Sequence, residues 1–206
     1  MKMNRKEYLT NEIVTLEWEM FRNVKGIGGR ASCQEDYATF KINRVSQARS
    51  WSEPALESYF EDLEKAKRQG RNLLSEKYAR MMASTSKSEY ESIKNLLPPL
   101  EDDIFPVVEK IVDIVIGWEQ EMMEKYPHLI RRGRPIYSSQ DTPDVTSLET
   151  YLRGELLTYS KKTLLLLQEH YHEQKTANIN GSEIILGHII KQHGYTSLEE
   201  ANKRTA

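Results

Sequence analysis

Apolar side chains recur along the chain at intervals of three and four residues, the spacing that gathers them on one face of a helix. The first such stretch places Ile13, Val14, Trp18 and Phe21 on a shared face. Polar capping residues and glycines separate the stretches, and none of them shows the alternation or the turn signals of a strand or hairpin. The pattern predicts an all-α fold, a single-domain bundle of about seven to nine helices with short joints.

Capping signals give approximate bounds for these helices. Ser32 and Glu35 form a capping box, Ser52 precedes a proline in the first turn of its helix, and Gly70 ends that helix. The predicted helices cover residues 10–24, 32–48, 53–70, 72–84, 86–97, 101–126, 146–175 and 182–193, with a short one after residue 196. The length fits one domain over residues 1–206, with a core over about 8–176 and a C-terminal helical appendage over about 177–206.

The segment Pro127–Val145 lacks helical periodicity and precedes a long predicted helix. A connection of this length in a compact domain is usually either functional or a flexible excursion from the surface. It contains three arginines, among them Arg134, and a Ser-Ser-Gln-Asp-Thr cluster. These residues favour an ordered, functional loop that covers a site and closes when a ligand is bound.

Three of the predicted helices carry polar side chains among their apolar positions. Glu17 lies in the middle of the apolar face of the first helix, and Glu155 lies with Tyr159 on the inner face of the helix that follows the long loop. The second helix carries an inward stripe of Cys33, Tyr37, Phe40, Arg44, Gln47 and Trp51. By contrast, the helices over 53–70 and 101–126 have apolar faces without a central charge.

A carboxylate within an apolar face is costly unless it is paired, hydrogen-bonded or protonated. We therefore expect the Arg44 guanidinium to be buried beside Glu17 or Glu155. A structural salt bridge would hold three helices in register, whereas a polar pocket between helices is a usual site in a bundle. One ion pair needs only one carboxylate, so the second glutamate, Gln47 and Cys33 favour the pocket. A filled core with Arg44 fully paired would support the salt bridge, and a cavity of a few hundred Å³, about the size of known ligand sites, would support the pocket.

The segment "GIGGRASC" gathers Gly28, Gly29, Arg30 and the only cysteine of the chain, Cys33. Glycines permit positive φ and a close backbone approach, and amides that follow an N-cap at Ser32 would favour an anion. The same field and the charge of Arg30 would favour a thiolate. The segment follows a helix and lacks the P-loop pattern, so it is not a nucleotide loop. An anion clamp, a nucleophilic cysteine and an inert buried cysteine stay open as interpretations.

Composition excludes several classes of function. The formal net charge of −2 gives no basic field for nucleic acid or an anionic membrane, and no apolar run approaches the ~20 residues of a membrane span. A single cysteine cannot form an internal disulfide, and the first residues lack the apolar core of a signal peptide, so we expect a cytoplasmic protein. The five histidines show no metal-binding spacing, so neither a metal nor a cofactor is predicted.

Four strings of the sequence resemble one known family: "LEWEMFRNVKGIGGRASCQ", "SQARSW", "GRNLLSEKYARMM" and "TSLETYLRGELLTYS". They are similar to the bacterial domain-of-unknown-function family 4125, from the first predicted helix through the helix over 146–175. The resemblance implies a bacterial, cytoplasmic protein. Because that family carries no established activity, the resemblance implies nothing about a substrate.

These patterns predict a polar pocket between the first, second and seventh helices, closed by the long loop, that binds a small anionic or zwitterionic metabolite. The candidate ligand-binding residues are Gly29, Arg30, Arg44, Gln47, Arg134 and Tyr159, and the candidate catalytic residues are Cys33, Glu17 and Glu155. The arginines and the amides after Ser32 would receive an acid, and a glutamate would take an amine or act as a general base. The protein would then be a metabolite-binding protein or an enzyme. The alternative is a non-enzymatic interaction or regulatory module whose buried charges are structural; the sequence gives no oligomeric state.

Overall fold

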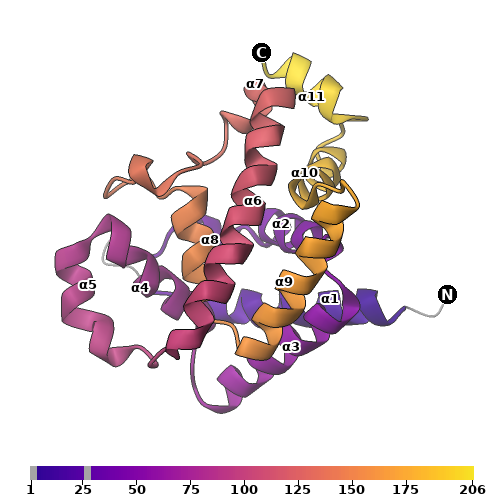
Figure 1. Cartoon of the computed structure of the whole chain (residues 1–206). Coiled ribbons are helices and arrows are strands. Elements are labelled where there is room, and N and C mark those ends of the chain that lie inside the picture. Colours follow the sequence, from indigo (N-terminus) through magenta and orange to yellow (C-terminus); the bar gives the residue numbers. More distant parts are fainter. Residues whose placement is uncertain (1–3, 26–28) are drawn as a thin grey trace.

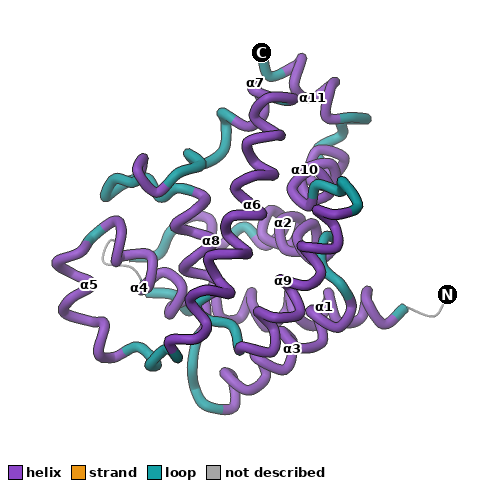
Figure 2. Tube along the Cα trace, viewed as in Figure 1, coloured by secondary structure: helices purple, strands orange, loops and turns teal. Residues whose placement is uncertain are grey.

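A computed structural model describes residues 4–25 and 29–206 and contains, within these ranges, eleven α-helices and no strand (Figures 1 and 2). The helices are α1 Arg5–Arg22, α2 Tyr37–Arg49, α3 Glu53–Arg68, α4 Leu73–Thr85, α5 Lys87–Ile93, α6 Phe105–Lys125, α7 Pro127–Ile130, α8 Leu148–Leu156, α9 Lys161–Thr176, α10 Gly181–Gln192 and α11 Leu198–Arg204. The predicted all-α single domain is confirmed, with slightly more helices than the seven to nine expected.

Most helices begin where the sequence offers a side chain that can accept a hydrogen bond from the first turn. The caps of this kind are Asn4, Asp36, Ser52, Asn72, Ser147, Ser160, Asn180 and Ser197. Each satisfies one of the backbone N–H groups that a helix start leaves without a partner. After α3, Gly70 adopts a φ of +67°, the left-handed conformation that ends a helix. The predicted bounds of α3 and α4 are therefore confirmed within the usual margin.

The predicted helix over 32–48 is wrong at its start. Residues Ser32–Glu35 form a 3₁₀ turn, and α2 begins only at Tyr37 with Asp36 as its cap. The buried Gln34 explains the difference: its amide accepts the Ala31 N–H at 2.8 Å and donates to the carbonyls at the end of α1 at 2.8 and 2.9 Å. This side chain ties the turn to α1, so the capping box predicted at Ser32 does not form.

The inward stripe is shorter than predicted for the same reason. Cys33 lies before α2 and is exposed, and Tyr37 is 41% exposed. The ring of Tyr37 instead packs against Trp18, with 5.2 Å between their centroids. The stripe is buried or half-buried only from Phe40 onward.

The single long helix predicted over 146–175 is also wrong, because the chain breaks between α8 and α9. The Asp62 carboxylate of α3 accepts the Ser160 N–H at 3.0 Å and the Thr163 hydroxyl at 2.7 Å. The Ser160 side chain in turn caps α9. The break is stabilised by a side chain that is distant in sequence, and no proline or glycine marks it.

Helix α6 crosses the middle of the molecule and packs against α8, α9 and α10 (Figure 1). Its buried residues Val108, Ile111 and Trp118 belong to the main core, which also includes side chains of α1, α3 and α9. A second core cluster joins the C-terminal segment to the far end of α6; it contains Met122, Tyr126, Ile190, Leu198 and Ala201. No helix in the described ranges has the length and hydrophobicity needed to cross a membrane.

The segment between α6 and α8 is irregular but well connected. It contains the short helix α7 and a 3₁₀ turn at Ser138–Gln140. The carbonyls of Pro135 and Ile136 accept backbone hydrogen bonds from the start of α8 at 2.8 and 3.0 Å, and the Ile136 side chain is buried. The Asp141 carboxylate accepts the Ser147 N–H at 2.6 Å. These contacts fix the second half of the loop against α8 and agree with the ordered interpretation.

Candidate functional site

The centre of the molecule holds a paired arginine. Arg44 of α2 donates from Nε to Oε2 of Glu17 at 2.6 Å and from Nη2 to Oε1 of the same carboxylate, which forms a bidentate contact with α1. The Tyr59 hydroxyl of α3 donates to Glu17 at 2.7 Å. The Glu17 residue is only 1% exposed, so these three hydrogen bonds replace the water that its carboxylate has lost.

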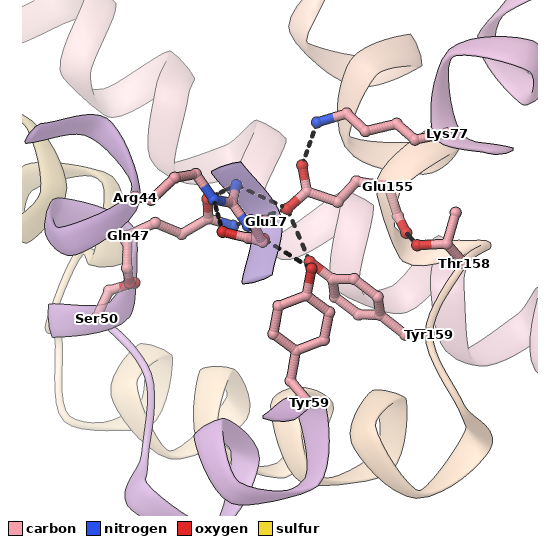
Figure 3. Close-up of polar contacts among 9 residues, drawn as sticks. All are labelled: Glu17, Arg44, Gln47, Ser50, Tyr59, Lys77, Glu155, Thr158 and Tyr159. Atoms are coloured by element: carbon pink, nitrogen blue, oxygen red, sulfur yellow. Dashed lines mark hydrogen bonds and ion pairs between the residues drawn. The ribbon is translucent and has the colours of Figure 1, made fainter. Parts of the chain in front are cut away.

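The second carboxylate, Glu155 of α8, is equally saturated (Figure 3). It accepts hydrogen bonds from Arg44 Nη1 at 3.1 Å, from the Gln47 amide at 3.2 Å and from the Tyr159 hydroxyl at 2.7 Å. The ammonium group of Lys77, on α4, contacts its other oxygen. Burial alone would raise the pKa of Glu155, but the charges of Arg44 and Lys77 and the hydrogen bonds outweigh it and hold the pKa well below the usual range.

This central network is electrically balanced, because Arg44 and Lys77 face Glu17 and Glu155. The prediction that Arg44 lies near Glu17 or Glu155 is confirmed, since the guanidinium contacts both, and its side chain is half-buried at 14% exposure. The network joins α1, α2, α3, α4 and α8, which is more helices than the three predicted. The network therefore fits the interpretation as a structural salt bridge, because every charge in it is paired and the pairs fix the register of the helices.

Two members of the network were missed in the sequence. Lys77 lies four residues after Leu73 and four before Met81, and both of these are buried. This spacing places Lys77 on the same face of α4 as two apolar residues and could have indicated that it points inward. Tyr59 lies in α3, whose face the sequence predicts to be apolar and without a central charge. Its hydroxyl is the polar end of an otherwise buried ring, and such a group needs a partner.

A cavity of about 300 Å³ lies beside the network, between α1, α2, α4, α8 and the loop before α8. We call it the aromatic cavity, because its walls carry the rings of Phe21, Phe40, Tyr59, Tyr78 and Tyr151. Both carboxylates of the network and both of its cations also line it. Its size is at the lower end of known small-molecule sites, roughly 300–1,000 Å³. The structure thus combines the two features that the sequence treated as alternatives, a fully paired Arg44 and a cavity.

A second cavity, of about 470 Å³, lies on the other side of Arg44, between α2, α6, α8 and α10. We call it the apolar cavity, because most of its wall is hydrophobic, including Val115, Trp118, Met122 and Leu186. The two cavities share a stretch of wall made by Asn43, Arg44, Arg134, Tyr151 and Glu155. A residue on this shared wall can therefore reach a molecule on either side.

Arg134 is the cation on the shared wall that no carboxylate pairs within the described part of the chain. Its Nη1 donates to the Thr146 carbonyl at 3.0 Å, and its guanidinium carbon lies 4.7 Å from the centre of the Tyr151 ring. Near it, the Tyr78 hydroxyl makes no hydrogen bond to any described residue. Burial and the neighbouring Tyr151 and Cys33 raise the pKa of Tyr78, so its phenol stays protonated and can donate.

The remaining predicted site residues divide into two groups. Cys33 lines the aromatic cavity, and Gln47 lines the apolar one. Gly29 and Arg30 line neither, and Arg30 instead lies near Gln34 O at 3.4 Å and Glu35 at 3.9 Å. Tyr159 lines neither cavity, and its hydroxyl donates to Glu155. Gly28 lies outside the described residues. The amides after Ser32 belong to a 3₁₀ turn, so the predicted anion clamp at the start of an α-helix is not formed there.

Metal-binding and acid–base groups are sparse around the cavities. Of the residues that the structure describes, no three histidine, cysteine or acidic side chains are grouped closely enough to hold a metal ion. No histidine is among the described residues that line either cavity. The third carboxylate on the aromatic cavity, Asp36, caps α2 by accepting the Thr39 N–H at 3.0 Å.

The fold and the site together define an all-α single-domain protein in which a neutral ion network separates two cavities. The chain belongs to the family described as "Protein of unknown function (DUF4125)", whose model matches residues 7–203. The family resemblance found in the sequence is thereby confirmed. No curated protein and no solved structure matches the chain.

Proposed function

We propose that the protein binds a small anionic or zwitterionic metabolite in the aromatic cavity, and that Arg134 and Tyr78 receive its acidic group. The observation that carries this proposal is a difference in hydrogen bonding on the wall. The buried carboxylates of Glu17 and Glu155 already accept several hydrogen bonds each. Two donors on the wall have bonding capacity left within the described part of the chain, the Arg134 guanidinium and the Tyr78 hydroxyl.

An anion fits such a wall better than a neutral or cationic ligand. A guanidinium carries five N–H donors, and the only hydrogen bond that Arg134 makes to the described residues uses one of them. A carboxylate or phosphate would accept two of the others in parallel. The aromatic rings of the cavity would hold the apolar part of the ligand. An amine on the same molecule would be drawn to Asp36, whose pKa is lowered by its hydrogen bonds to Thr39 and which is therefore ionised.

Binding is better supported than acid–base catalysis. A general base works best with a pKa near the operating pH, and the pKa of Glu155 is far below it. Cys33 is the remaining candidate nucleophile on the wall, and no described histidine lines the cavity to accept its proton. Covalent chemistry at Cys33 would thus depend on a base supplied by the ligand.

The interaction or regulatory module stays the second candidate, because the complete pairing of Arg44 and Lys77 is what a purely structural network requires. The two proposals differ in what they expect of Arg134, because only the first assigns its guanidinium a role in binding a ligand. The proposal places the protein in a bacterial cytoplasm, where a reducing environment keeps an exposed thiol such as Cys33 free.

Native mass spectrometry tests the proposal. Protein purified from bacterial cells without denaturation is measured intact and then after acid extraction, beside the Arg134→Ala variant. We expect a retained molecule that carries an acidic group and is lost or strongly reduced in the variant. A retained neutral molecule, or an anion that Arg134→Ala retains equally, would contradict the proposed role of Arg134.

A further inference from the structure

Glu119 of α6 is a carboxylate on the wall of the apolar cavity that the proposed function does not use. Within the described residues it forms no ion pair, and its hydrogen-bond partner is the Ser182 hydroxyl at the start of α10. Burial raises its pKa, and the hydrogen bond from Ser182 offsets this only in part. This is the reverse of the central network, where each carboxylate has a cation.

The surroundings of Glu119 are those of a site for an apolar molecule. The neighbouring Trp118 is 4% exposed and packs edge-on against Tyr171, with 5.1 Å between the ring centroids. Gly181 permits this arrangement, because a Cβ at that position would lie 2.6 Å from the Trp118 ring. Both aromatic residues line the cavity. Of the two carboxylates on this wall, Glu119 and Glu155, Glu119 is thus the one without a paired cation, and it lies among aromatic and aliphatic side chains.

An unpaired carboxylate on such a wall is costly, and an apolar side chain would avoid that cost. The cations of the shared wall do not relieve it: Arg44 is committed to two carboxylates, and among the described residues Arg134 forms no ion pair with Glu119. A positive charge on a bound ligand would compensate the Glu119 carboxylate. An ammonium group has three N–H donors, which Glu119 and the Ser182 oxygen can accept.

We infer that the apolar cavity is a second binding site, which takes a primary amine with an apolar body and holds its ammonium group at Glu119. Ser182 supplies a second acceptor for the ammonium group. The alkyl or aryl body lies against Trp118, Met122 and Leu186, and the aromatic faces of the cavity favour a cation. The residues named for the amine, Glu119, Ser182, Trp118, Met122 and Leu186, do not line the aromatic cavity, so this inference can be tested independently of the anion site.

Two probes of equal chain length test this site: n-hexylamine, which is protonated at neutral pH, and 1-hexanol, which is neutral. The chain contains three tryptophans, Trp18, Trp51 and Trp118, and only Trp118 lines the apolar cavity. Their indole N–H resonances in a ¹⁵N-labelled sample therefore report separate places. We expect hexylamine to shift the Trp118 resonance saturably, with an affinity at least about tenfold higher than that of hexanol, as for a hydrogen bond to a charged group.

The decisive variant is Glu119→Gln, which keeps the size of the side chain and removes its charge. We expect it to weaken hexylamine by about tenfold or more, to the level of hexanol, and to leave hexanol binding unchanged. The matched control is Glu124→Gln, which removes an exposed carboxylate from the same helix outside this cavity. Equal affinities for the two probes, unchanged hexylamine binding in Glu119→Gln, or no shift of Trp118 with hexylamine would each overturn the inference.

Discussion

Arg44 and Arg134 both line the two cavities, and the structure holds them in opposite ways. The Arg44 side chain is 14% exposed and donates to Glu17, Glu155 and Gln47. Arg134 is exposed and, among the described residues, donates only to the Thr146 carbonyl while it lies over the Tyr151 ring. One guanidinium is part of the packed interior, and the other keeps most of its donors for solvent or a ligand.

The difference separates charges that hold the fold from charges that are available for binding. A buried and balanced network gains little net stability over a well-packed apolar core, yet removing one member leaves the others as uncompensated charges. An exposed cation bonded to one carbonyl can exchange that partner for an anion without disturbing the interior. The predictions below test this division by changing residues on each side of it.

The largest change in the free energy of unfolding is expected for a substitution of Arg44. Arg44→Met keeps a long side chain but leaves Glu17 with no cation and Glu155 with only Lys77. We expect the free energy of unfolding at pH 7 to fall by about 3–5 kcal/mol, as for other broken buried pairs. Urea denaturation measures this. Arg49→Met, an exposed arginine on the same helix, serves as the control and should change it by less than about 0.5 kcal/mol. A loss below about 1 kcal/mol for Arg44→Met would show that the network does not hold the fold.

A smaller effect is expected at Gly154, where α8 approaches α4. A Cβ there would lie 2.6 Å from Met81 Cγ and 3.1 Å from the Lys77 carbonyl oxygen. Gly154→Ala should therefore push the helix that carries Glu155 away from Lys77 and lower the free energy of unfolding by about 1–3 kcal/mol. Gly187→Ala, at a glycine of α10 with open space around it, is the matched control and should raise stability by about 0.4–1 kcal/mol. Equal behaviour of the two variants would mean that the close α4–α8 approach is not needed.

A still smaller effect, of opposite sign, is expected for Glu119→Gln. Burial raises the pKa of Glu119 above its ordinary value of 4.5, so the folded state binds this proton more tightly than the unfolded state does. The wild-type protein thus loses stability as the pH rises from about 4.5 through the raised pKa, and the variant lacks this loss. Urea denaturation should show the variant more stable than wild type at pH 8, with the difference vanishing below pH 4. A variant less stable at pH 8 would mean that the ionised Glu119 has a favourable partner.

The smallest effect on stability is expected for Arg134→Ala. The substitution removes one exposed hydrogen bond and one contact with a ring, so the free energy of unfolding should change by less than about 0.5 kcal/mol. Thermal or urea unfolding of the unliganded protein measures this. Unfolding of the variant under ordinary conditions would show that Arg134 packs the loop and is not free to serve a ligand.

The sequence predicted best where helical spacing alone decides the outcome. The spacing of Glu17, Arg44 and Glu155 within apolar stripes was enough to predict that they meet. The parts that failed depend on partners that are distant in sequence: Asp62 stabilises the break before Ser160, and Gln34 bonds the end of α1. No local pattern records such contacts, so a helix was predicted across both places.

The cavities could not be predicted in detail for the same reason. The sequence indicates Arg134 as a ligand-binding residue because its loop is long and basic. It does not indicate which side chains Arg134 faces. Tyr78 and Glu119 were not singled out, because helical spacing does not show whether a side chain at the edge of an apolar face meets a neighbouring helix or an open space. The free donors and the unpaired carboxylate become visible only when every partner is known.

The central claim is that Arg134 receives an anion in the aromatic cavity, and a calorimetric titration with benzoate and the neutral benzamide tests it most directly. We expect wild type to bind benzoate at least about tenfold more tightly than benzamide, and Arg134→Ala to lose this preference. Arg132→Ala, an exposed arginine of the same loop that lines neither cavity, should keep it. Equal binding of the two probes by wild type, or an unchanged preference in Arg134→Ala, would contradict the account.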